Sequence, residues 1–313
     1  MRPVTRRIAS AAVAAALCAA AAGCGLGAGA SSAGDPVVVT VTRDFGTRLV
    51  QQRTTAHPPS SDTVMRLLER GATVRTRYGG GFVQCIDALC GTSAGLDWFY
   101  FVNGVLATKG AAATRVHGGD HIWWDRRDWR AAQEVPAVVG SFPEPFLHGP
   151  GNGKRLPVRI ECADTGSPAC TAVEHELVRY DIPAAKGTIG SSFTSDTLRV
   201  LVGPWKSVRA DPAVSALEDG PQASGVFAEP RQDGTAIALL DARGRVLRSL
   251  GPGGGLVAAT RAGGDQPVWA VTGTDERGVR AAAAAFSQAA LRNRFAVAVQ
   301  SGSAPIALPL EAG

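Results

Sequence analysis

Aromatic side chains gather in one part of the sequence, between Trp98 and Trp124. Trp98 and Tyr100 lie two residues apart in the segment DWFYFVNG, and the adjacent pair Trp123 and Trp124 follows in HIWWD. The chain has only 6 Trp and 3 Tyr in 313 residues, so this concentration requires a physical reason. Exposed indole and phenol rings stack on flat ligands or pack on partner proteins, whereas buried rings build the core of a small domain.

Strand periodicity divides these rings between two faces. Both segments have the composition of β-strands, in which successive side chains point to opposite faces. Trp98 and Tyr100 therefore share a face, while Trp123 and Trp124 must point opposite ways. We expect one of this pair in the core and the other on the surface near Tyr100, where it would suit stacking on a ligand. The alternative is that all the rings pack the interior. The candidate ligand-binding residues are Trp98, Tyr100, Asn103, Asp120, Trp123 and Trp124.

Two turns are expected to hold these strands in place. Asn103-Gly104 suits a type I′ hairpin turn, because both positions require a positive φ. Gly119-Asp120 is expected to form a second turn, in which the carboxylate of Asp120 accepts backbone N–H groups.

Two residue patterns are similar to enzyme or metal-site motifs, but the secondary structure expected around them does not fit those motifs. GTSAG (91–95) fits G-x-S-x-G, but a nucleophile elbow needs a strand before Ser93 and a helix after it. Here a predicted disulfide loop precedes the serine and a strand follows. His117 and His121, with nearby aspartates, are separated by a Gly-Gly turn and do not share one helical face, as a metal-binding helix would require. We therefore predict no catalytic residue, no enzyme activity and no metal site.

Phosphate-binding loops and nucleic-acid binding are disfavoured on similar grounds. Residues 149–154 (GPGNGK) lack the Walker spacing and its final Ser or Thr, and residues 251–255 read as a turn between strands. The formal charge of +5 comes partly from arginines in the first residues, and no Lys/Arg run is interleaved with aromatics.

The N-terminus has the pattern of an exported lipoprotein. Arg2, Arg6 and Arg7 precede an uncharged, Ala-rich run over 8–22 that is too short and too weakly apolar to anchor the chain as a membrane helix. Small residues then lead to Cys24, the expected site of lipidation. The chain is expected to sit at the outer face of the cell membrane, held by this lipid; ordinary secretion is the alternative.

Four cysteines remain beyond the predicted signal and Cys24, an even number that suits an oxidising compartment. Four cysteines allow three pairings, and sequence proximity favours Cys85–Cys90 and Cys162–Cys170. A structural zinc site would require pairs of cysteines closer together in the sequence, with histidines nearby.

The segment from Val37 to Trp129, a third of the chain, resembles the transcobalamin C-terminal-like domain family. A helix and a Gly-rich turn precede a W-x-x-[YF]-x-N-G segment and then a G-D-x-[IV]-x-[WF] strand. The resemblance implies a small β-grasp-like module, which in the vitamin carriers closes over a corrinoid as the smaller of two lobes. The helical barrel that forms the other lobe is missing here. The matching residues are Trp98, Tyr100 or Phe101, Asn103, Gly104, Gly119, Asp120, Ile122 and Trp124.

The remaining elements complete an expected α+β module followed by an α/β domain. A helix is expected over 60–71 with Ser61 or Asp62 as its cap, and the longest helix over 276–294 with Thr274 or Asp275 as its cap. Strand and helix patterns alternate in the second half, which is typical of α/β folds. The predicted divisions are a signal (1–24), a flexible tether (25–35), the module (36–136), a Pro/Gly linker (137–156) and the α/β domain (157–304).

The sequence predicts a non-catalytic envelope lipoprotein that binds a small molecule, with a corrinoid as one candidate ligand. It would present that molecule to an uptake system, with a transporter component or a helical-barrel envelope protein as partner. The alternative is a structural or assembly protein that docks another protein through its aromatic surface. A hydrolase ranks third, because no site for one can be assembled from the sequence.

Overall fold

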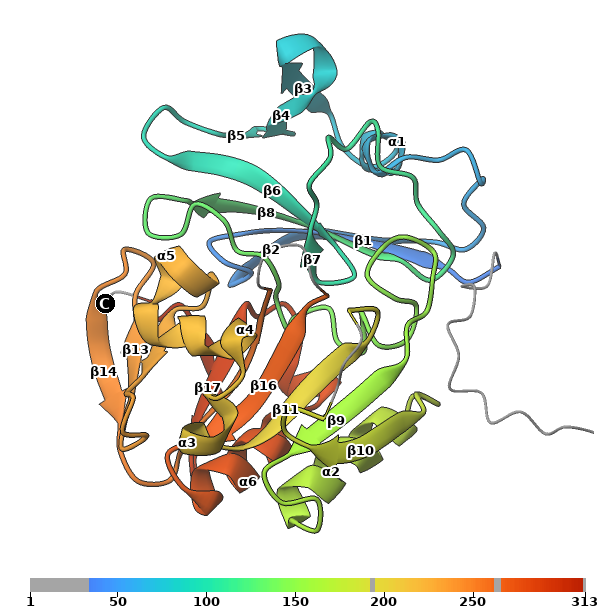
Figure 1. The fold of residues 1–313 in the computed structure, drawn as a ribbon. Coiled ribbons are helices and arrows are strands. Elements are labelled where there is room, and N and C mark those ends of the chain that lie inside the picture. The colour runs from blue at the N-terminus through green and yellow to red at the C-terminus, as the bar shows by residue number, and fades with distance from the viewer. Residues whose placement is uncertain (1–33, 192–194, 262–265, 312–313) are drawn as a thin grey trace, which may run out of the picture.

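The computed structural model describes residues 34–191, 195–261 and 266–311 (Figure 1). The predicted signal, Cys24 and the tether as far as residue 33 lie outside these residues. Strands predominate over helices, so the chain as a whole is an α+β protein. Within the described ranges, the helices are all too short or too polar to cross a bilayer.

The N-terminal half contains a five-stranded sheet in the order β2-β1-β8-β6-β7. Its central strands β1 and β8 are parallel, and the other neighbours are antiparallel. The predicted strands over 37–44, 97–104 and 121–129 are all present in this sheet. Its strands are β1 (Val37–Arg43), β2 (Arg48–Thr55), β6 (Leu96–Val102), β7 (Val105–Leu106) and β8 (His121–Asp128).

A helix and a small three-stranded sheet cover one face of this five-stranded sheet. Helix α1 buries its apolar side chains, and its N-cap is Thr63 rather than Ser61 or Asp62. Asp62 instead pairs with Arg70 at 2.6 Å. The elements are α1 (Val64–Glu69), β3 (Val74–Arg77), the 3-10 turn η1 (Tyr78–Gly80), β4 (Phe82–Ile86) and β5 (Leu89–Cys90).

The C-terminal half is built on a seven-stranded sheet in the order β10-β9-β11-β16-β15-β17-β18. The neighbours β10, β9, β11 and β16 are parallel to one another. Strands β15, β17 and β18 pair antiparallel, so the sheet of the expected α/β domain is mixed. The strands are β9 (Val158–Cys162), β10 (Ala184–Thr188), β11 (Leu198–Pro204), β15 (Gly254–Thr260), β16 (Val268–Gly273), β17 (Ala296–Gln300) and β18 (Ile306–Leu308).

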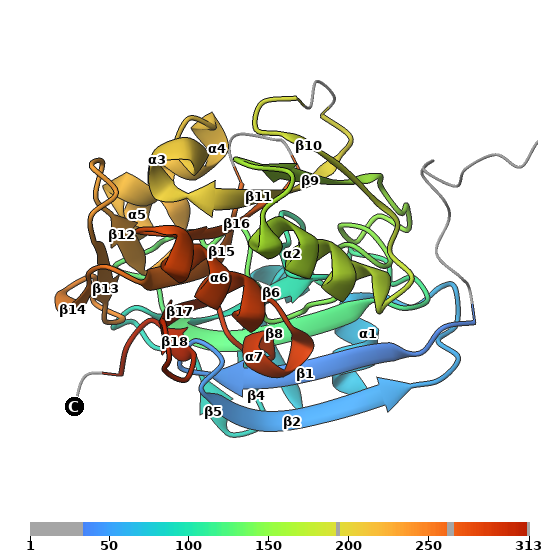
Figure 2. The same ribbon diagram turned by 90° about the horizontal axis from the view of Figure 1, so that it is seen from below.

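Two helices pack on one face of this sheet, α2 (Pro168–Val178) and α6 (Glu276–Ala285) (Figure 2). Asp275 caps α6 by accepting the N–H of Gly278 at 2.9 Å, as predicted. The prediction of a single long helix over 276–294 is wrong, because α6 ends at Ala285 and a separate short helix follows, α7 (Gln288–Leu291).

The remaining short elements lie beside the other face of the seven-stranded sheet. They form one small antiparallel sheet and a series of single-turn helices between β11 and β15. These are α3 (Trp205–Val208), α4 (Pro212–Ser215), η2 (Ala216–Asp219), α5 (Pro221–Ser224), β12 (Ala228–Pro230), β13 (Ile237–Leu240) and β14 (Val246–Leu250).

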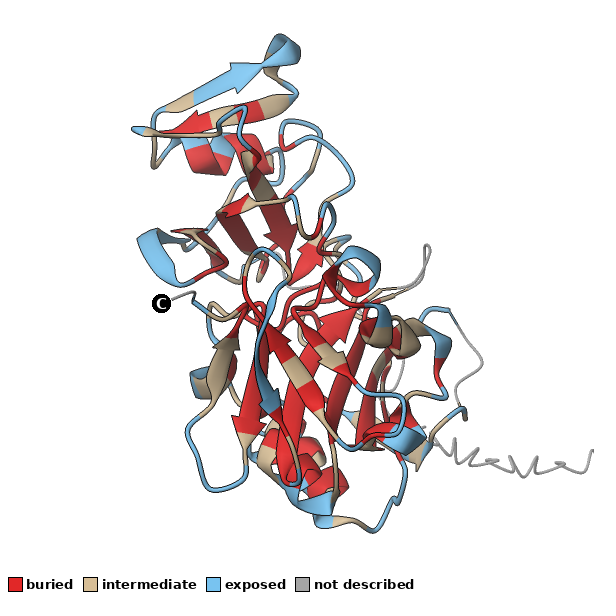
Figure 3. Cartoon of the chain, turned by 90° about the vertical axis from the view of Figure 1, so that its left-hand side faces the viewer, coloured by how far each residue is buried: buried red, intermediate tan, exposed pale blue. Residues whose placement is uncertain are grey.

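The two halves share one hydrophobic core. Phe45, Phe101 and Trp123 of the N-terminal half are buried in the same cluster as residues of the seven-stranded sheet. The ring of Phe295 lies 5.7 Å from that of Phe101 and 5.3 Å from that of Trp123. Phe45 contacts Phe227 with ring centroids 5.0 Å apart. Figure 3 shows buried segments in both sheets.

Residues 137–156, interpreted from the sequence as a Pro/Gly linker, are largely packed into the protein. Phe142 and Phe146 are buried, and their rings lie 4.9 Å from Phe286 and 5.0 Å from Trp269 respectively. The segment therefore works as part of the core and does not hold two independent bodies apart. Its glycines and prolines serve tight turns, including the cis peptide bond at Phe142-Pro143.

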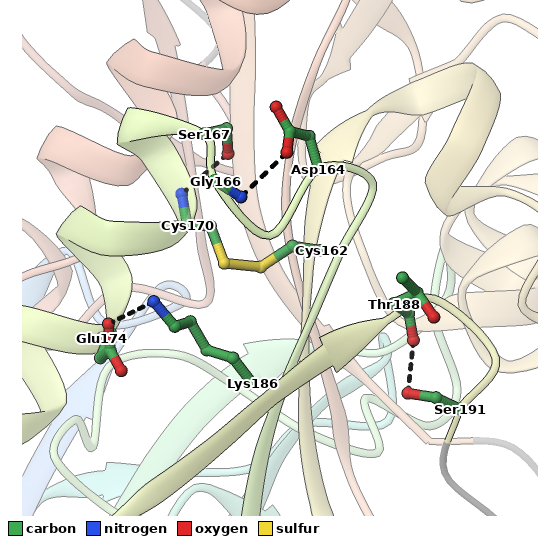
Figure 4. The surroundings of a disulfide bond; sticks show 9 residues. All are labelled: Cys162, Asp164, Gly166, Ser167, Cys170, Glu174, Lys186, Thr188 and Ser191. Carbon is green, nitrogen blue, oxygen red and sulfur yellow. Dashed lines mark hydrogen bonds and ion pairs between the residues drawn. A yellow bond between two sulfur atoms is a disulfide. The ribbon is translucent and has the colours of Figure 1, made fainter.

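Both predicted disulfides are present. Cys85–Cys90 joins the neighbouring strands β4 and β5, with 4.0 Å between the Cα atoms. Cys162–Cys170 joins the end of β9 to the first turn of α2, with 6.1 Å between the Cα atoms (Figure 4). Ser167 caps that helix by accepting the N–H of Cys170 at 3.2 Å, which positions the second sulfur.

Candidate ligand-binding site

Three of the candidate residues meet on one face of the five-stranded sheet. Trp98, Tyr100 and Trp124 all belong to the core beneath α1, and each is less than a tenth exposed. The rings of Tyr100 and Trp124 are stacked, with centroids 4.8 Å apart. These side chains come from adjacent antiparallel strands, where Tyr100 lies opposite Trp124.

Trp123 points to the opposite face, as strand periodicity requires, but it is buried as well. Its side chain is fully enclosed, and its Nε1 donates a hydrogen bond of 2.7 Å to the hydroxyl of Thr42. The prediction that one of Trp123 and Trp124 is a surface aromatic is therefore wrong. Both faces of the sheet are covered, one by α1 with the small sheet and the other by the C-terminal half.

Asn103 and Asp120 hold the ends of β6 and β8 together. Asn103 and Gly104 have φ of 53° and 77°, which confirms the predicted type I′ turn. The Asn103 amide donates to Asp120 at 2.8 Å and to the carbonyl of Gly149 at 2.7 Å. Asp120 also accepts the backbone N–H of His117 at 2.8 Å, as predicted for this turn. Both side chains are buried and are engaged by the protein itself.

A small cavity lies next to the first group of aromatics. It has a volume of about 210 Å³ and is lined by Trp98, Tyr100 and Trp124 on the sheet side. Phe82 and residues 106–111 close its other side. The wall combines aromatic and aliphatic side chains with polar groups, and both kinds of group occur in small-molecule sites.

Polar groups around this cavity differ in how they are satisfied. Trp98 donates from Nε1 to the carbonyl of Leu89 at 3.1 Å. The hydroxyl of Tyr100 bonds the carbonyl of Lys109 and, at 2.7 Å, the hydroxyl of Thr114. Burial raises the pKa of Tyr100, so this hydroxyl stays protonated. Trp124 differs from these two residues, because its buried Nε1 has no hydrogen-bond acceptor in the described part of the chain.

The histidines and aspartates considered for a metal have other partners. His121 contacts the hydroxyl of Thr40 at 2.9 Å, and Asp125 accepts a hydrogen bond of 2.6 Å from Thr42. Across the described ranges, no group of three or more His, Cys, Asp and Glu side chains is arranged to hold a metal ion. Ser93 lies in the loop before β6, with no helix after it.

Sequence reasoning missed the residues that close the aromatic cavity. Phe82 and the segment 106–111 are distant from each other in sequence, and neither contains a motif. Only the tertiary fold brings them over β6 and β8. For the sheet side of the cavity the sequence did contain a signal, because the alternation of side chains along β6 places Trp98 and Tyr100 on one face.

Comparisons with known proteins found similarity over part of the chain only. Residues 61–127 match a family model described as a domain of unknown function, DUF4430. That range includes all six candidate residues and the segment 106–111. No curated protein matches the chain. A solved structure from Ruminococcus gnavus ATCC 29149, described as a "putative metal binding protein", is 18% identical, with a TM-score of 0.25 over 30% of this chain and 97% of its own.

Proposed function

We propose that the chain is a non-catalytic envelope lipoprotein whose N-terminal module binds a small, flat apolar group in the cavity beside Trp124. The observation that supports this function is the position of three predicted ligand residues, Trp98, Tyr100 and Trp124, around one cavity. Neither their strands nor their spacing required a hollow there. Aromatic walls recognise planar ligands by stacking and by the burial of apolar surface.

The size of the cavity limits the ligand. Pockets that enclose a whole drug-sized molecule measure roughly 300–1,000 Å³, whereas this cavity has about 210 Å³. It therefore takes a single ring system and not a macrocycle. The corrinoid version of the proposal, which follows from the resemblance to the transcobalamin C-terminal-like family, then requires that only a peripheral group of the corrinoid enters.

The envelope location is a proposal that rests on the N-terminal sequence and on the cysteines. Lipidation at Cys24 would place the module outside the cytoplasm, tethered to the cell membrane, where the two disulfides are stable. A transporter component or a helical-barrel envelope protein would then receive the ligand. The alternative of an assembly protein loses its basis, because the aromatic residues proposed for that surface are buried.

Calorimetric titration of the full-length chain in detergent tests the proposal directly. The probes are benzimidazole, as a single flat ring system, and cobalamin, as a whole corrinoid. We expect saturable binding of benzimidazole, and any binding of cobalamin should compete with it. Absence of heat for both probes would refute the binding function.

A matched pair of variants places the site. Ala107 lines the cavity and is partly buried, whereas Ala112 lies outside it on the same connection and is exposed. Ala107→Leu fills the cavity and should weaken benzimidazole binding about tenfold or more, the equivalent of roughly 1.4 kcal/mol. Ala112→Leu should leave the affinity unchanged. Equal effects of the two substitutions would assign the binding to another place.

A further inference from the structure

The hairpin of β3 and β4 extends beyond the five-stranded sheet and ends in an aromatic turn (Figure 1). Tyr78 begins the turn η1, and its side chain is 86% exposed. The ring of Phe82 follows three glycines and lies 6.5 Å from that of Tyr78, measured between centroids. Single exposed rings are common on protein surfaces, so exposure alone does not assign a role to Tyr78.

The backbone at Tyr78 is in a conformation that disfavours a large side chain. Its φ is 54°, in the left-handed region where Gly, Asn and Asp are the usual residues. Gly79 and Gly80 follow with φ of 67° and 93°, so the whole turn is left-handed. A glycine or asparagine at position 78 would form the same turn with less strain, and the exposed ring gains little from packing. The turn therefore holds an aromatic ring in the solvent despite the strain in its backbone.

The strand that leads to this turn is basic. Arg75 and Arg77 are exposed on β3, and Arg77 lies opposite Phe82 in the hairpin. They are the only charged residues in the sequence from 71 to 86. Arg75 donates to the Sγ of Cys90 at 3.0 Å, and this sulfur is neutral. Neither arginine forms an ion pair with a carboxylate in the described part of the chain.

The acidic residues of the neighbouring elements do not cancel this charge. Asp87 follows β4 at the end of the hairpin away from the turn, where it accepts the N–H of Thr73 at 2.9 Å. Glu69 of α1 lines a groove beside the turn, but two cations, Arg66 and Arg115, line the same groove. The end of the hairpin therefore combines exposed aromatic rings with a positive charge.

This combination fits a membrane surface better than a protein partner. Tyrosine rings are enriched at the headgroup level of membranes, and arginines near the surface are attracted by anionic lipids. A stable protein interface buries roughly 1,200 Å² or more, which the end of one hairpin does not supply. A lipid surface requires no matching shape, so one ring and two cations can engage it.

We propose that the turn at Tyr78 docks on an anionic phospholipid membrane, with its ring among the headgroups and Arg75 and Arg77 against the lipid phosphates. This proposal rests on the envelope location in the proposed function, where the predicted lipid at Cys24 holds the chain at such a surface. Docking would also fix how the module faces the membrane. Because Phe82 closes one side of the aromatic cavity, that cavity would then lie close to the lipid.

A tryptophan reporter in the full-length chain tests the docking. The chain is bound to phosphatidylglycerol vesicles whose lipids are brominated near the headgroup, since bromine quenches an indole ring that touches the lipid. Tyr78→Trp keeps a ring in the turn, and subtraction of the wild-type signal removes the native tryptophans, most of which are buried. We expect strong quenching at residue 78 that weakens as salt is added and is much smaller in phosphatidylcholine vesicles.

Matched variants place the effect in the turn. Val246→Trp puts a ring at an exposed position on β14 and should not be quenched. In the Tyr78→Trp chain, Arg77→Gln removes one cation and should lower the ratio of docked to undocked chains about fivefold. Arg248→Gln removes the same charge from an exposed position on β14 and should change this ratio less than about twofold.

Flotation of the vesicles separates anchoring from docking. If the chain floats but residue 78 is not quenched, the anchor stands and the docking proposal is wrong. If the chain does not float with phosphatidylglycerol vesicles, both are wrong. Equal quenching in the two lipids, or equal effects of the two arginine substitutions, would also overturn the proposal. Benzimidazole binding should be unchanged in Tyr78→Trp, because Tyr78 does not line the aromatic cavity, so a failure of docking is distinct from a failure of that site.

Discussion

The adjacent residues Trp123 and Trp124 are equally buried but differ in one hydrogen bond. Trp123 donates to Thr42, whereas the Nε1 of Trp124 has no acceptor among the described residues. Replacement by Phe removes a similar ring volume at each position, but only at Trp123 does it remove a satisfied bond, worth about 1–2 kcal/mol. We therefore expect Trp123→Phe to lower the free energy of unfolding more than Trp124→Phe, by about that amount. Urea denaturation of both variants measures the difference, and equal losses would contradict it.

Because its pKa is lowered by folding, His121 makes the free energy of unfolding decrease as the pH falls. Burial, and to a lesser extent the charge of Arg292, lowers the pKa of His121 to about 4. In the unfolded chain its pKa is about 6.5, so the unfolded state binds an extra proton between these values. The stability contributed by His121 is therefore complete above pH 6.5 and is lost as the pH falls toward 4.

Asp125 acts in the opposite sense and must be separated from this effect. Burial raises the pKa of Asp125 to about 6, so its contribution decreases as the pH rises through this range. The comparison of wild type with His121→Gln cancels the Asp125 contribution. We expect the advantage of the wild type in unfolding free energy to shrink by about 2 kcal/mol between pH 8 and pH 5. Urea unfolding at the two pH values measures it, and a constant advantage would contradict the assignment.

At the scale of elements, the turn between β6 and β7 carries two separate contributions from Asn103. The residue has a φ of 53°, and its amide bonds both Asp120 and the segment at Gly149. Asn103→Gly keeps the backbone freedom and loses the bonds, whereas Asn103→Ala loses both. We expect Asn103→Ala to be less stable than Asn103→Gly by about 1 kcal/mol in thermal or urea unfolding. The opposite order would show that the left-handed turn is not maintained.

Sequence patterns predicted elements well where the signal was local. The alternation in β6, the Asn-Gly turn and the two short cysteine spacings all depend on residues close in the chain. The segment 276–294 was predicted as one helix, but it forms two, because the break at Phe286 coincides with the packing of this ring on Phe142 and Trp269. The prediction that one of Trp123 and Trp124 is exposed was wrong for a similar reason, since side chains of the C-terminal half, such as Phe295, cover Trp123. The aromatic cavity also depends on contacts between residues distant in sequence, which no single-sequence pattern predicts.

At the scale of the molecule, the shared core predicts that the two halves unfold together. Phe295 of the C-terminal half contacts three rings of the N-terminal half, those of Phe45, Phe101 and Trp123. Phe295→Ala should cost about 3–5 kcal/mol and shift a single calorimetric transition to lower temperature. Two separate transitions, in the wild type or in the variant, would show that the halves are independent.

The burial of Phe101 and Trp123 has a consequence for how this module can occur in other chains. A module of this kind without a C-terminal half would expose two large rings on the outer face of its sheet, which invites aggregation. Free-standing versions should therefore have polar or small residues at these two positions, while the rings on the cavity side are kept. Large aromatic residues at the positions of Phe101 and Trp123 then mark those copies of the module that fold only together with an adjoining domain.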